Sequence, residues 1–164
     1  MKEKKHSTVV YLALGSNLGA RYILLSQAIT RLDEEVGSIM DIAPYYETAP
    51  WGFTSEHHFL NTVVALRTHL SAEELLTETQ RIERSLGRTS KHLRDENYTD
   101  RTIDIDILFY GEEVICSNHL VVPHPLLHER LFVLEPLAQI APNLMHPEKR
   151  QTILALLEAK KAKE

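Results

Sequence analysis

The order of its periodic segments is the feature of this 164-residue chain that most restricts its fold. Residues 8–14 form a continuous apolar run typical of a buried strand, and an amphipathic helix is predicted from about residue 20 to residue 36. Two extended runs follow, at 38–47 and 59–68, and then a helix that begins at the capping box Ser71-Ala72-Glu73-Glu74 and stops at Gly87. Residues 103–109 form the next strand, so the segments run strand–helix–strand–strand–helix–strand.

That order is the split βαβ pattern, which predicts an α+β fold built on a ferredoxin-like antiparallel sheet. Residues 126–140 are predicted to be mainly helical with an interruption near Pro136, and a last helix is expected from about 152 to 160. We expect helices on both faces of the sheet, a three-layer α-β-α arrangement, in a single domain over residues 1–164. Two glycines carry local predictions: Gly37 as the C′ residue of the first helix, and Gly111 as the turn of a hairpin into residues 114–115.

The composition of the chain argues against several classes of protein. The chain is 43% hydrophobic and 25% charged, which is ordinary for a globular protein that needs no disulfide to hold its core. Cys116 is the only cysteine, and a small core hydrophobe is the preferred interpretation of it. The net charge of −5 without a basic block argues against a nucleic-acid partner, and no apolar run reaches membrane-spanning length. We therefore expect a cytoplasmic protein whose main partner is not nucleic acid.

Asp104 and Asp106 are the strongest chemical signal. Residues two apart on a strand share a face, so the two carboxylates stand together. The predicted opposite face is apolar: Ile103, Ile105, Ile107 and Phe109. Two like charges on one strand face repel each other unless a cation lies between them, and oxygen ligands suit magnesium. A solvent-facing strand that happens to carry two acids is the alternative interpretation.

Other candidate residues remain ambiguous when taken singly. The junction Gly15-Ser16-Asn17 presents backbone N–H groups that could hold an anion, although ordinary turn and N-cap chemistry explains it equally well. The stretch 88–101 carries cations that suit phosphate, but interspersed acids are also typical of a solvated loop. These cations are Arg88, Lys91, Arg94 and Arg101.

A second group of candidates suits a flat ligand. Gln80 and Glu83 share one helix face, and they could contact a ligand or only water. Asn61 lies on the same strand face as Phe59, and an amide beside an aromatic ring suits a heterocycle with donor and acceptor edges. Trp51 and Phe132 are further aromatic candidates, although aromatic residues more often belong to the core. The histidines lack zinc-like spacing, and most are interpreted as structural, with His124 as the exception.

Together these residues closely resemble the 6-hydroxymethyl-7,8-dihydropterin pyrophosphokinase family, from Tyr11 to about Leu144. Each segment alone is a weak signal, but their order and spacing are highly specific. The segments are Tyr11-Leu-Ala-Leu-Gly-Ser-Asn-Leu-Gly19, Tyr46-Glu-Thr-Ala-Pro-Trp-Gly52, Phe59-Leu-Asn61, Gln80-Arg-Ile-Glu83, Gly87-Arg88, Arg101-Thr-Ile-Asp-Ile-Asp-Ile107, Val122-Pro-His124 and Arg130-x-Phe132.

The resemblance implies transfer of the β,γ-diphosphate of ATP to the hydroxymethyl group of the pterin, giving AMP and the pterin diphosphate in folate biosynthesis. It implies that Asp104 and Asp106 hold two Mg²⁺ ions and that Arg88 and Arg101 stabilise charge during the transfer. The implied ATP site comprises Gln80, Glu83, Arg88, Tyr98, Arg101, Ile107, His124 and Arg130. The implied pterin site comprises Thr48, Ala49, Pro50, Trp51, Phe59, Asn61 and Phe132.

The chain also departs from the family pattern. Residues 97–100 stand where the family often has a basic residue, an aromatic residue, Gly and Pro, and Ser90 stands where a second loop arginine is often found. Pro125 follows His124 where the family can carry an aromatic residue. Two other functions stay open at this point: a metal-dependent phosphohydrolase that uses the same Asp pair, and a non-catalytic ferredoxin-like binding module.

Overall fold

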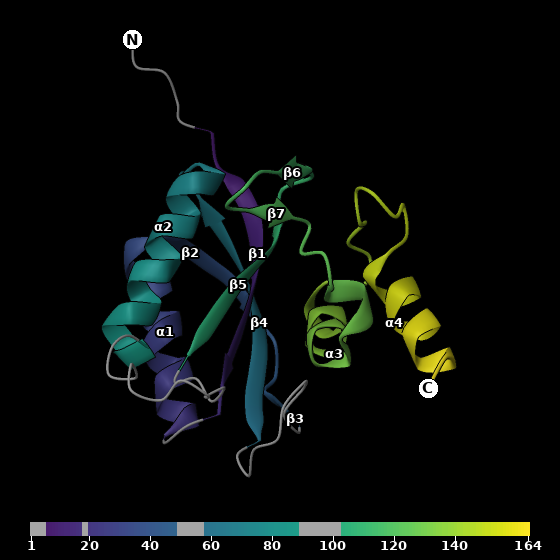
Figure 1. Cartoon of the computed structure of the whole chain (residues 1–164), viewed down its shortest axis with the longest axis horizontal. Coiled ribbons are helices and arrows are strands. Elements are labelled where there is room, and N and C mark those ends of the chain that lie inside the picture. Colours follow the sequence, from purple (N-terminus) through teal and green to yellow (C-terminus); the bar gives the residue numbers. More distant parts are fainter. Residues whose placement is uncertain (1–5, 18–19, 49–57, 89–102) are drawn as a thin grey trace.

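The protein is built on a five-stranded antiparallel sheet (Figure 1). The structure, a computed structural model, describes residues 6–17, 20–48, 58–88 and 103–164. The strands are β1 (Thr8–Ser16), β2 (Gly37–Ile42), β3 (Tyr46–Thr48), β4 (Phe59–Thr68) and β5 (Asp104–Tyr110). Their order is β2-β4-β1-β5, with β3 paired to the start of β4. This order confirms the predicted ferredoxin-like core, because each helix links two strands that are not neighbours in the sheet.

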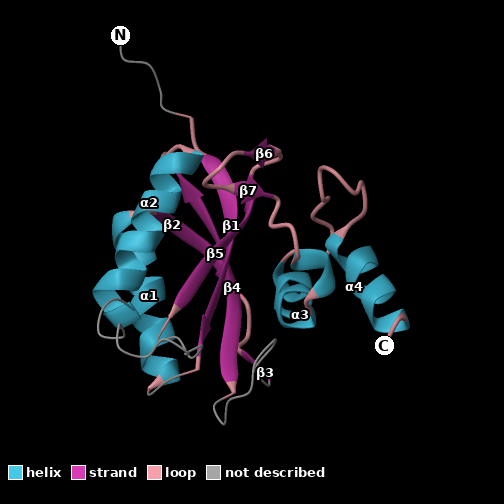
Figure 2. Ribbon diagram, viewed as in Figure 1, coloured by secondary structure: helices cyan, strands magenta, loops and turns pink. Residues whose placement is uncertain are grey.

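Helices cover both faces of this sheet (Figure 2), so the predicted three-layer arrangement is confirmed. The helices α1 (Arg21–Glu35) and α2 (Ala72–Glu83) pack on one face. On the other face α3 (Leu131–Ile140) contacts the sheet, and α4 (Ile153–Ala162) packs against α3. No helix within the described ranges is long and apolar enough to cross a membrane.

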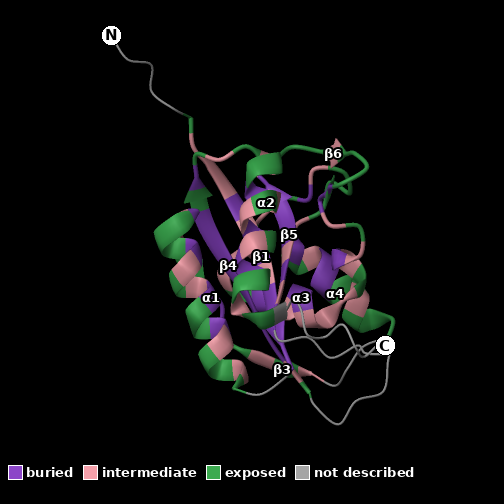
Figure 3. Cartoon of the chain, turned by 60° about the vertical axis from the view of Figure 1, so that its left-hand side comes forward, coloured by how far each residue is buried: buried purple, intermediate pink, exposed green. Residues whose placement is uncertain are grey.

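Each face of the sheet has its own apolar core, which appears as a buried band in Figure 3. Fully buried leucines of β1, α1 and α2 fill the first core. Phe109 and Leu108 of β5 fill the second core together with residues of α3 and α4. Each large side chain removed from water in this way contributes about 1.5–3 kcal/mol, so the sheet is held from both sides.

A β-bulge in β5 overturns one predicted side-chain orientation. Tyr11 pairs with Phe109 and Leu12 with Ile107, so Leu108 is the extra residue between two paired positions. Up to Ile107 the strand alternates as predicted, but after the bulge Phe109 lies in the second core. The prediction that Phe109 shares a face with Ile103, Ile105 and Ile107 is therefore wrong. The bulge depends on pairing with β1, which the local alternation does not reveal.

Gly37 has a different role from the predicted one. It is the first residue of β2, and the preceding helix ends at Val36 in a right-handed helical conformation. A Cβ at Gly37 would lie 2.2 Å from the carbonyl oxygen of Arg67, so the glycine permits close approach of two backbones. Gly37 does follow the C-cap residue Val36, which is the predicted C′ position, but it does not have a left-handed φ. The requirement for glycine arises instead from β4, 30 residues further along the chain.

Three further local predictions are corrected. Cys116 is exposed and is not a core residue. Gly111 has a left-handed φ of 56°, but residues 114–115 do not pair with β5 as a hairpin. Instead β6 (Ile115–Cys116) pairs with β7 (Val121–Val122) in a separate two-stranded sheet. Pro136 lies inside α3 without interrupting it, and the break falls earlier, at Arg130, after a short 3₁₀ turn over Leu127–Glu129.

The start of α2 forms as the sequence predicts. The hydroxyl of Ser71 accepts the N–H of Glu74 at 3.1 Å, and the N–H of Ser71 donates to the carboxylate of Glu74 at 2.8 Å. Both interactions together make the capping box. This fixes the first turn of the helix whose other end, at Glu83, reaches the cavity described below.

The stability of the protein is expected to fall as the pH drops below about 6.5, partly through His146. This side chain is 3% exposed, and its Nδ1 accepts the N–H groups of Glu148 and Lys149 at 3.1 and 3.0 Å. Burial, and then the charge of Lys149, lower the pKa of His146. The unfolded chain therefore binds a proton that the folded chain resists, so this contribution is complete above the unfolded pKa and is lost as the pH falls.

Urea unfolding at pH 7.5 and pH 5.5 measures this effect. The variant His146→Asn keeps an acceptor near the position of Nδ1 but does not titrate, so its free energy of unfolding should change less between the two pH values than that of the wild type. An equal change in both proteins would show that other groups account for the pH dependence. His124 and His128, whose pKa values are also lowered by burial, are the groups to substitute next.

Candidate active site

A cavity of about 650 Å³ lies around the free edge of β5. Its wall includes residues from both faces of β5, from the C-terminal half of α2 and from the start of α3. The cavity brings together every predicted site residue whose side chain the structure describes. These residues are Thr48, Phe59, Asn61, Gln80, Glu83, Asp104, Asp106, Ile107, His124, Arg130 and Phe132.

Several predicted residues lie outside the described part of the chain. Ala49, Pro50, Trp51, Tyr98 and Arg101 fall in the ranges 49–57 and 89–102, as do Lys91 and Arg94. The backbone of Arg88 ends the π-helical turn Arg84–Arg88, but its side chain is not described. Of the segments 48–58 and 88–100, the structure describes only residues 48, 58 and 88.

Asp104 and Asp106 line the cavity from the first half of β5. Both are half-buried, and their cross-strand partners on β1 are the small residues Gly15 and Ala13. Small partners leave space above the sheet beside the two carboxylates. Two carboxylates in a polar recess provide the hard oxygen ligands that magnesium prefers, and water supplies its remaining ligands in such sites. Within the described ranges no three acids, histidines or cysteines gather as a metal-binding group, so the fit rests on this pair.

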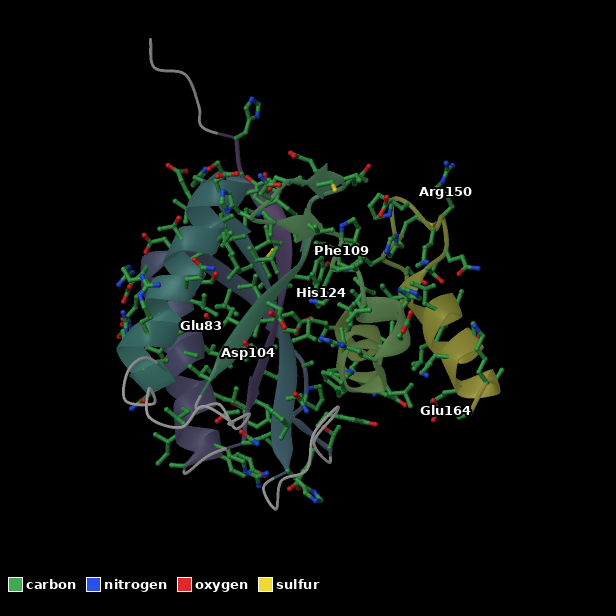
Figure 4. The ribbon with its side chains drawn as sticks, viewed as in Figure 1. Glu83, Asp104, Phe109, His124, Arg150 and Glu164 are labelled. Atoms are coloured by element: carbon green, nitrogen blue, oxygen red, sulfur yellow. The ribbon has the colours of Figure 1, made fainter. Side chains whose placement is uncertain are left out.

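Glu83 connects the end of α2 to the backbone between these aspartates (Figure 4). It is 5% exposed, and its Oε2 accepts the N–H of Ile105 at 2.6 Å. β5 is the edge strand of the sheet in the described part of the chain, so this N–H points away from β1, and no strand within the described ranges pairs with it. The carboxylate of Glu83 therefore accepts the N–H that a neighbouring strand would otherwise accept, at the residue between Asp104 and Asp106.

His124 lies on the opposite side of the cavity from Glu83 and is tied to β5 by its own backbone. Its N–H donates to the carbonyl of Leu108 at 3.0 Å, and its Nδ1 accepts the N–H of Leu126 at 3.1 Å. Burial, and then the charge of Arg130, lower the pKa of His124, whereas Asp104 opposes the shift. The ring is therefore neutral near pH 7, and since Nδ1 is an acceptor, its proton is on Nε2.

Arg130 and Phe132 flank the first residue of α3 and line the same cavity. The guanidinium carbon of Arg130 lies 5.6 Å from the centre of the Phe132 ring, within the range of a cation–π contact. One short segment thus places a fixed positive charge beside an aromatic face.

The other wall of the cavity has an aromatic and an amide side chain. Asn61 of β4 is 6% exposed, and its Nδ2 donates to the carbonyl of Tyr46 and to Oγ1 of Thr48, both at 3.2 Å. Phe59 lies two residues earlier on the same strand, and both line the cavity. The amide is held in one orientation beside the ring, as the recognition of a planar heterocycle requires.

Some lining residues were missed by the sequence analysis. Leu76 lies four residues before Gln80 on α2, so the helical period that identified Gln80 and Glu83 could also have found it. Gly15 was considered only for the backbone N–H groups of its junction, and no chemical signal in the sequence marks Ala13, His119, Leu120 and Val121. The last three come from the β6–β7 region, which reaches the cavity only through the fold.

Comparisons with known proteins agree with this site. A sequence model of the family described as 7,8-dihydro-6-hydroxymethylpterin-pyrophosphokinase (HPPK) matches residues 11–142. A 2-amino-4-hydroxy-6-hydroxymethyldihydropteridine pyrophosphokinase from Porphyromonas gingivalis is 50% identical over 141 residues, which are 85% of this chain and 95% of that protein. The proteins of the same name from Bacillus subtilis and Aquifex aeolicus are 43% and 41% identical, over 82% and 88% of this chain and 78% and 87% of theirs.

Solved structures with a similar fold include the HPPK-DHPS of Plasmodium falciparum, in the wild-type crystal structure with pteroate. The TM-score is 0.77 at 16% sequence identity, over 99% of this chain. This chain spans 44% of that longer one, and at such low identity the likeness concerns the fold alone. From the sequence matches, the chain belongs to the 7,8-dihydro-6-hydroxymethylpterin-pyrophosphokinase family.

Proposed function

We propose that the protein transfers the β,γ-diphosphate of ATP to the hydroxymethyl oxygen of 6-hydroxymethyl-7,8-dihydropterin, a step of folate biosynthesis. One observation carries the proposal: a single cavity is lined by Arg130, by the Asp104–Asp106 pair of β5 and, across β1, by the Phe59–Asn61 pair of β4. A charged half for a polyphosphate and a flat half for a heterocycle are the two parts that such a transfer must hold together.

The nucleotide would occupy the half between α2, β5 and the segment around His124. Gln80, Glu83 and Ile107 line this half, and the N–H of Ile107 has the same outward direction as that of Ile105, two residues earlier. This edge of β5 can form hydrogen bonds with the edge of a nucleotide base. The Nε2–H of His124 and the guanidinium of Arg130 would bind phosphate oxygens, and we assign Arg88, Tyr98 and Arg101 to the same half.

The pterin would lie between Phe59 and Phe132, with its polar edge at Asn61 and Thr48. The aromatic rings orient the heterocycle, and the amide distinguishes it from an apolar ring of the same size. We assign Ala49, Pro50 and Trp51, from the segment that follows Thr48, to the same subsite.

Asp104 and Asp106 would hold two Mg²⁺ ions. When bound there, magnesium neutralises phosphate oxygens and lowers the pKa of the attacking hydroxyl. In the reaction the hydroxymethyl oxygen bonds to the β-phosphorus, the bond from that phosphorus to the bridging oxygen of the α-phosphate breaks, and AMP leaves with the electron pair. The hydroxyl proton passes to solvent. The contribution of the chain is to align the two substrates and to stabilise the charge, through Arg130, His124, Arg88 and Arg101.

We also propose that residues 1–164 form a single domain that works as a monomer in the cytoplasm, on small molecules and not on nucleic acid or membranes. The two hydrophobic cores share one sheet, and the presence of a single cysteine suits a reducing compartment.

Purified protein with ATP, Mg²⁺ and 6-hydroxymethyl-7,8-dihydropterin is expected to form AMP and pterin diphosphate in equal amounts. Chromatography of the nucleotides and pterins measures both products. Reactions without the pterin, or with EDTA, are the controls and should give no AMP. Phosphate release without the pterin would favour a phosphohydrolase, and ligand binding without AMP or magnesium dependence would favour a binding module. Either result would overturn the proposal.

A further inference from the structure

Gly15 occupies the centre of a row of residues that crosses the sheet between the two halves of the cavity. It pairs with Asn61 on β4 and with Asp104 on β5, and Asn61 pairs in turn with Tyr46 on β3. Adjacent strands are about 4.8 Å apart, so Asn61 and Asp104 lie roughly 10 Å from each other across β1. Gly15 is the only residue between them in this row, and it lines the cavity.

The orientation of the Asn61 amide is fixed by β3. Its nitrogen lies 3.2 Å from the carbonyl oxygen of Tyr46, and a carbonyl oxygen can only accept a hydrogen bond. The second hydrogen of the amide is donated to Thr48. The carbonyl oxygen of Asn61 is therefore the atom that faces β1, and it can only accept a hydrogen bond.

That oxygen occupies the space of a side chain at position 15. A Cβ on Gly15 would lie 2.9 Å from Oδ1 of Asn61 and 3.6 Å from Cδ1 of Phe59. The first distance is shorter than a Cβ contact allows, whereas the second is an ordinary van der Waals contact. Gly15 lies within β1 and does not have a left-handed φ, so the backbone itself would accept alanine. Among the residues that the structure describes, only the Asn61 amide requires glycine here.

We propose that Gly15 is a positioning and specificity-determining residue. Its missing side chain keeps the Asn61 carbonyl oxygen at the cavity wall, as an acceptor for an N–H on the edge of a planar heterocycle. It also leaves the cavity wall without a side chain between that acceptor and Asp104. The heterocycle that fits is one that donates a ring or exocyclic N–H, and a ring with acceptors only is disfavoured because it would face another acceptor. The inference rests on the proposed function, since it concerns the pterin half of the same site.

The variant Gly15→Ala tests the proposal. We expect the Kd for 6-hydroxymethyl-7,8-dihydropterin to rise about tenfold or more, because a hydrogen bond to the buried amide is misaligned. The Kd for a nonhydrolysable ATP analogue should stay within about twofold of the wild-type value, because the nucleotide half does not contact Asn61. Calorimetric titration of the protein of residues 1–164, with the ATP analogue and Mg²⁺ present for the pterin measurement, gives both values.

Gly37→Ala is the matched control, since it places the same methyl group on a strand glycine away from the cavity. Its Cβ would meet the backbone of Arg67, so the melting temperature should fall while the pterin Kd of the folded protein stays unchanged. Wild-type pterin affinity in Gly15→Ala would overturn the inference while leaving the proposed function intact. Failure of the wild type to bind the pterin at all would instead refute the proposed function.

A double variant shows whether Gly15 acts through Asn61. Once Asn61→Ala has removed the amide, adding Gly15→Ala should change the pterin Kd by less than about twofold, because no oxygen remains to be displaced. This comparison also decides the question if Gly15→Ala alone does not fold, since the shorter side chain at 61 makes room for the methyl group. A further large loss of pterin affinity in the double variant would contradict a positioning role through Asn61.

Discussion

Asp104→Asn and Asp106→Asn are each expected to lower kcat by about 10²–10³-fold, the usual cost of removing one preorganised electrostatic group from a transition state. The substitution keeps the shape of each side chain but removes the charge that would hold magnesium. Both residues line the cavity on the exposed edge of the sheet, and their cross-strand neighbours are Ala13 and Gly15. The core is not disturbed, so the melting temperature should remain close to that of the wild type. Steady-state AMP formation at saturating substrates, combined with a magnesium titration, measures the effect.

Asp41→Asn is the matched control for these variants. Asp41 also lies on a strand, but it is exposed on β2 and accepts the N–H of the adjacent Ile42 at 3.0 Å. The same change of charge at this position should leave kcat within about twofold of the wild-type value. Turnover near the wild-type rate in both Asp104→Asn and Asp106→Asn would refute the metal-binding role of the pair.

Glu83→Ala is expected to lower both stability and activity. The carboxylate is 5% exposed and accepts the N–H of Ile105 at 2.6 Å, and without it a buried donor on the edge strand loses its partner. An unsatisfied buried donor costs about 1–3 kcal/mol, which for a protein of this size lowers the melting temperature by roughly 2–10 °C. Because Ile105 separates Asp104 from Asp106, a looser strand also misplaces both carboxylates, and kcat should fall about tenfold or more. Thermal unfolding and AMP formation measure the two effects.

Two other substitutions show whether these effects arise from the lost hydrogen bond between Glu83 and Ile105. Glu83→Gln keeps an acceptor oxygen at the same length, so it should retain most of the stability lost in Glu83→Ala. Glu78→Ala removes a carboxylate from the same helix, but Glu78 pairs with Arg81 near the surface, where such pairs contribute about 0–1 kcal/mol. If Glu83→Ala had no greater effect than Glu78→Ala on either measurement, the proposed link between α2 and the Asp pair would be wrong.

Local patterns were sufficient to predict most of the helices and strands. The run from Phe59 to Thr68 is β4 as predicted, and the capping box at Ser71 begins α2, because periodicity and capping depend on neighbours a few residues away. The predicted ferredoxin-like core is also confirmed, since few topologies suit a split βαβ sequence of elements.

Three of the local predictions that proved wrong depend on distant contacts. The bulge at Leu108 arises from pairing with β1, and it moves Phe109 into the second core. Gly37 is required by the approach of Arg67, and the two-residue strand β6 pairs with β7 instead of β5. Each of these features involves atoms that are far apart in the sequence.

The candidate site also has parts that local patterns predicted and parts that only the fold revealed. Periodicity alone placed Asp104 beside Asp106, Phe59 beside Asn61 and Gln80 beside Glu83, since a strand or helix fixes which of its own residues share a face. Family resemblance then suggested which half of a substrate each pair would bind. Neither source could identify the steric role of Gly15 or the β6–β7 residues of the cavity wall, because an absent side chain and a short loop have no chemical signature of their own.

The sequence by itself determined the order of strands and helices, the acidic face of β5 and the family to which the chain belongs. The tertiary structure alone decided that α2, β5 and the start of α3 enclose one cavity, that Glu83 satisfies the edge N–H of Ile105, and that the Asn61 oxygen fills the space above Gly15. The physical reason is that these interactions join residues at different separations along the chain. Backbone periodicity acts over a few residues, whereas steric exclusion and hydrogen bonding across the sheet act between residues that only folding brings together.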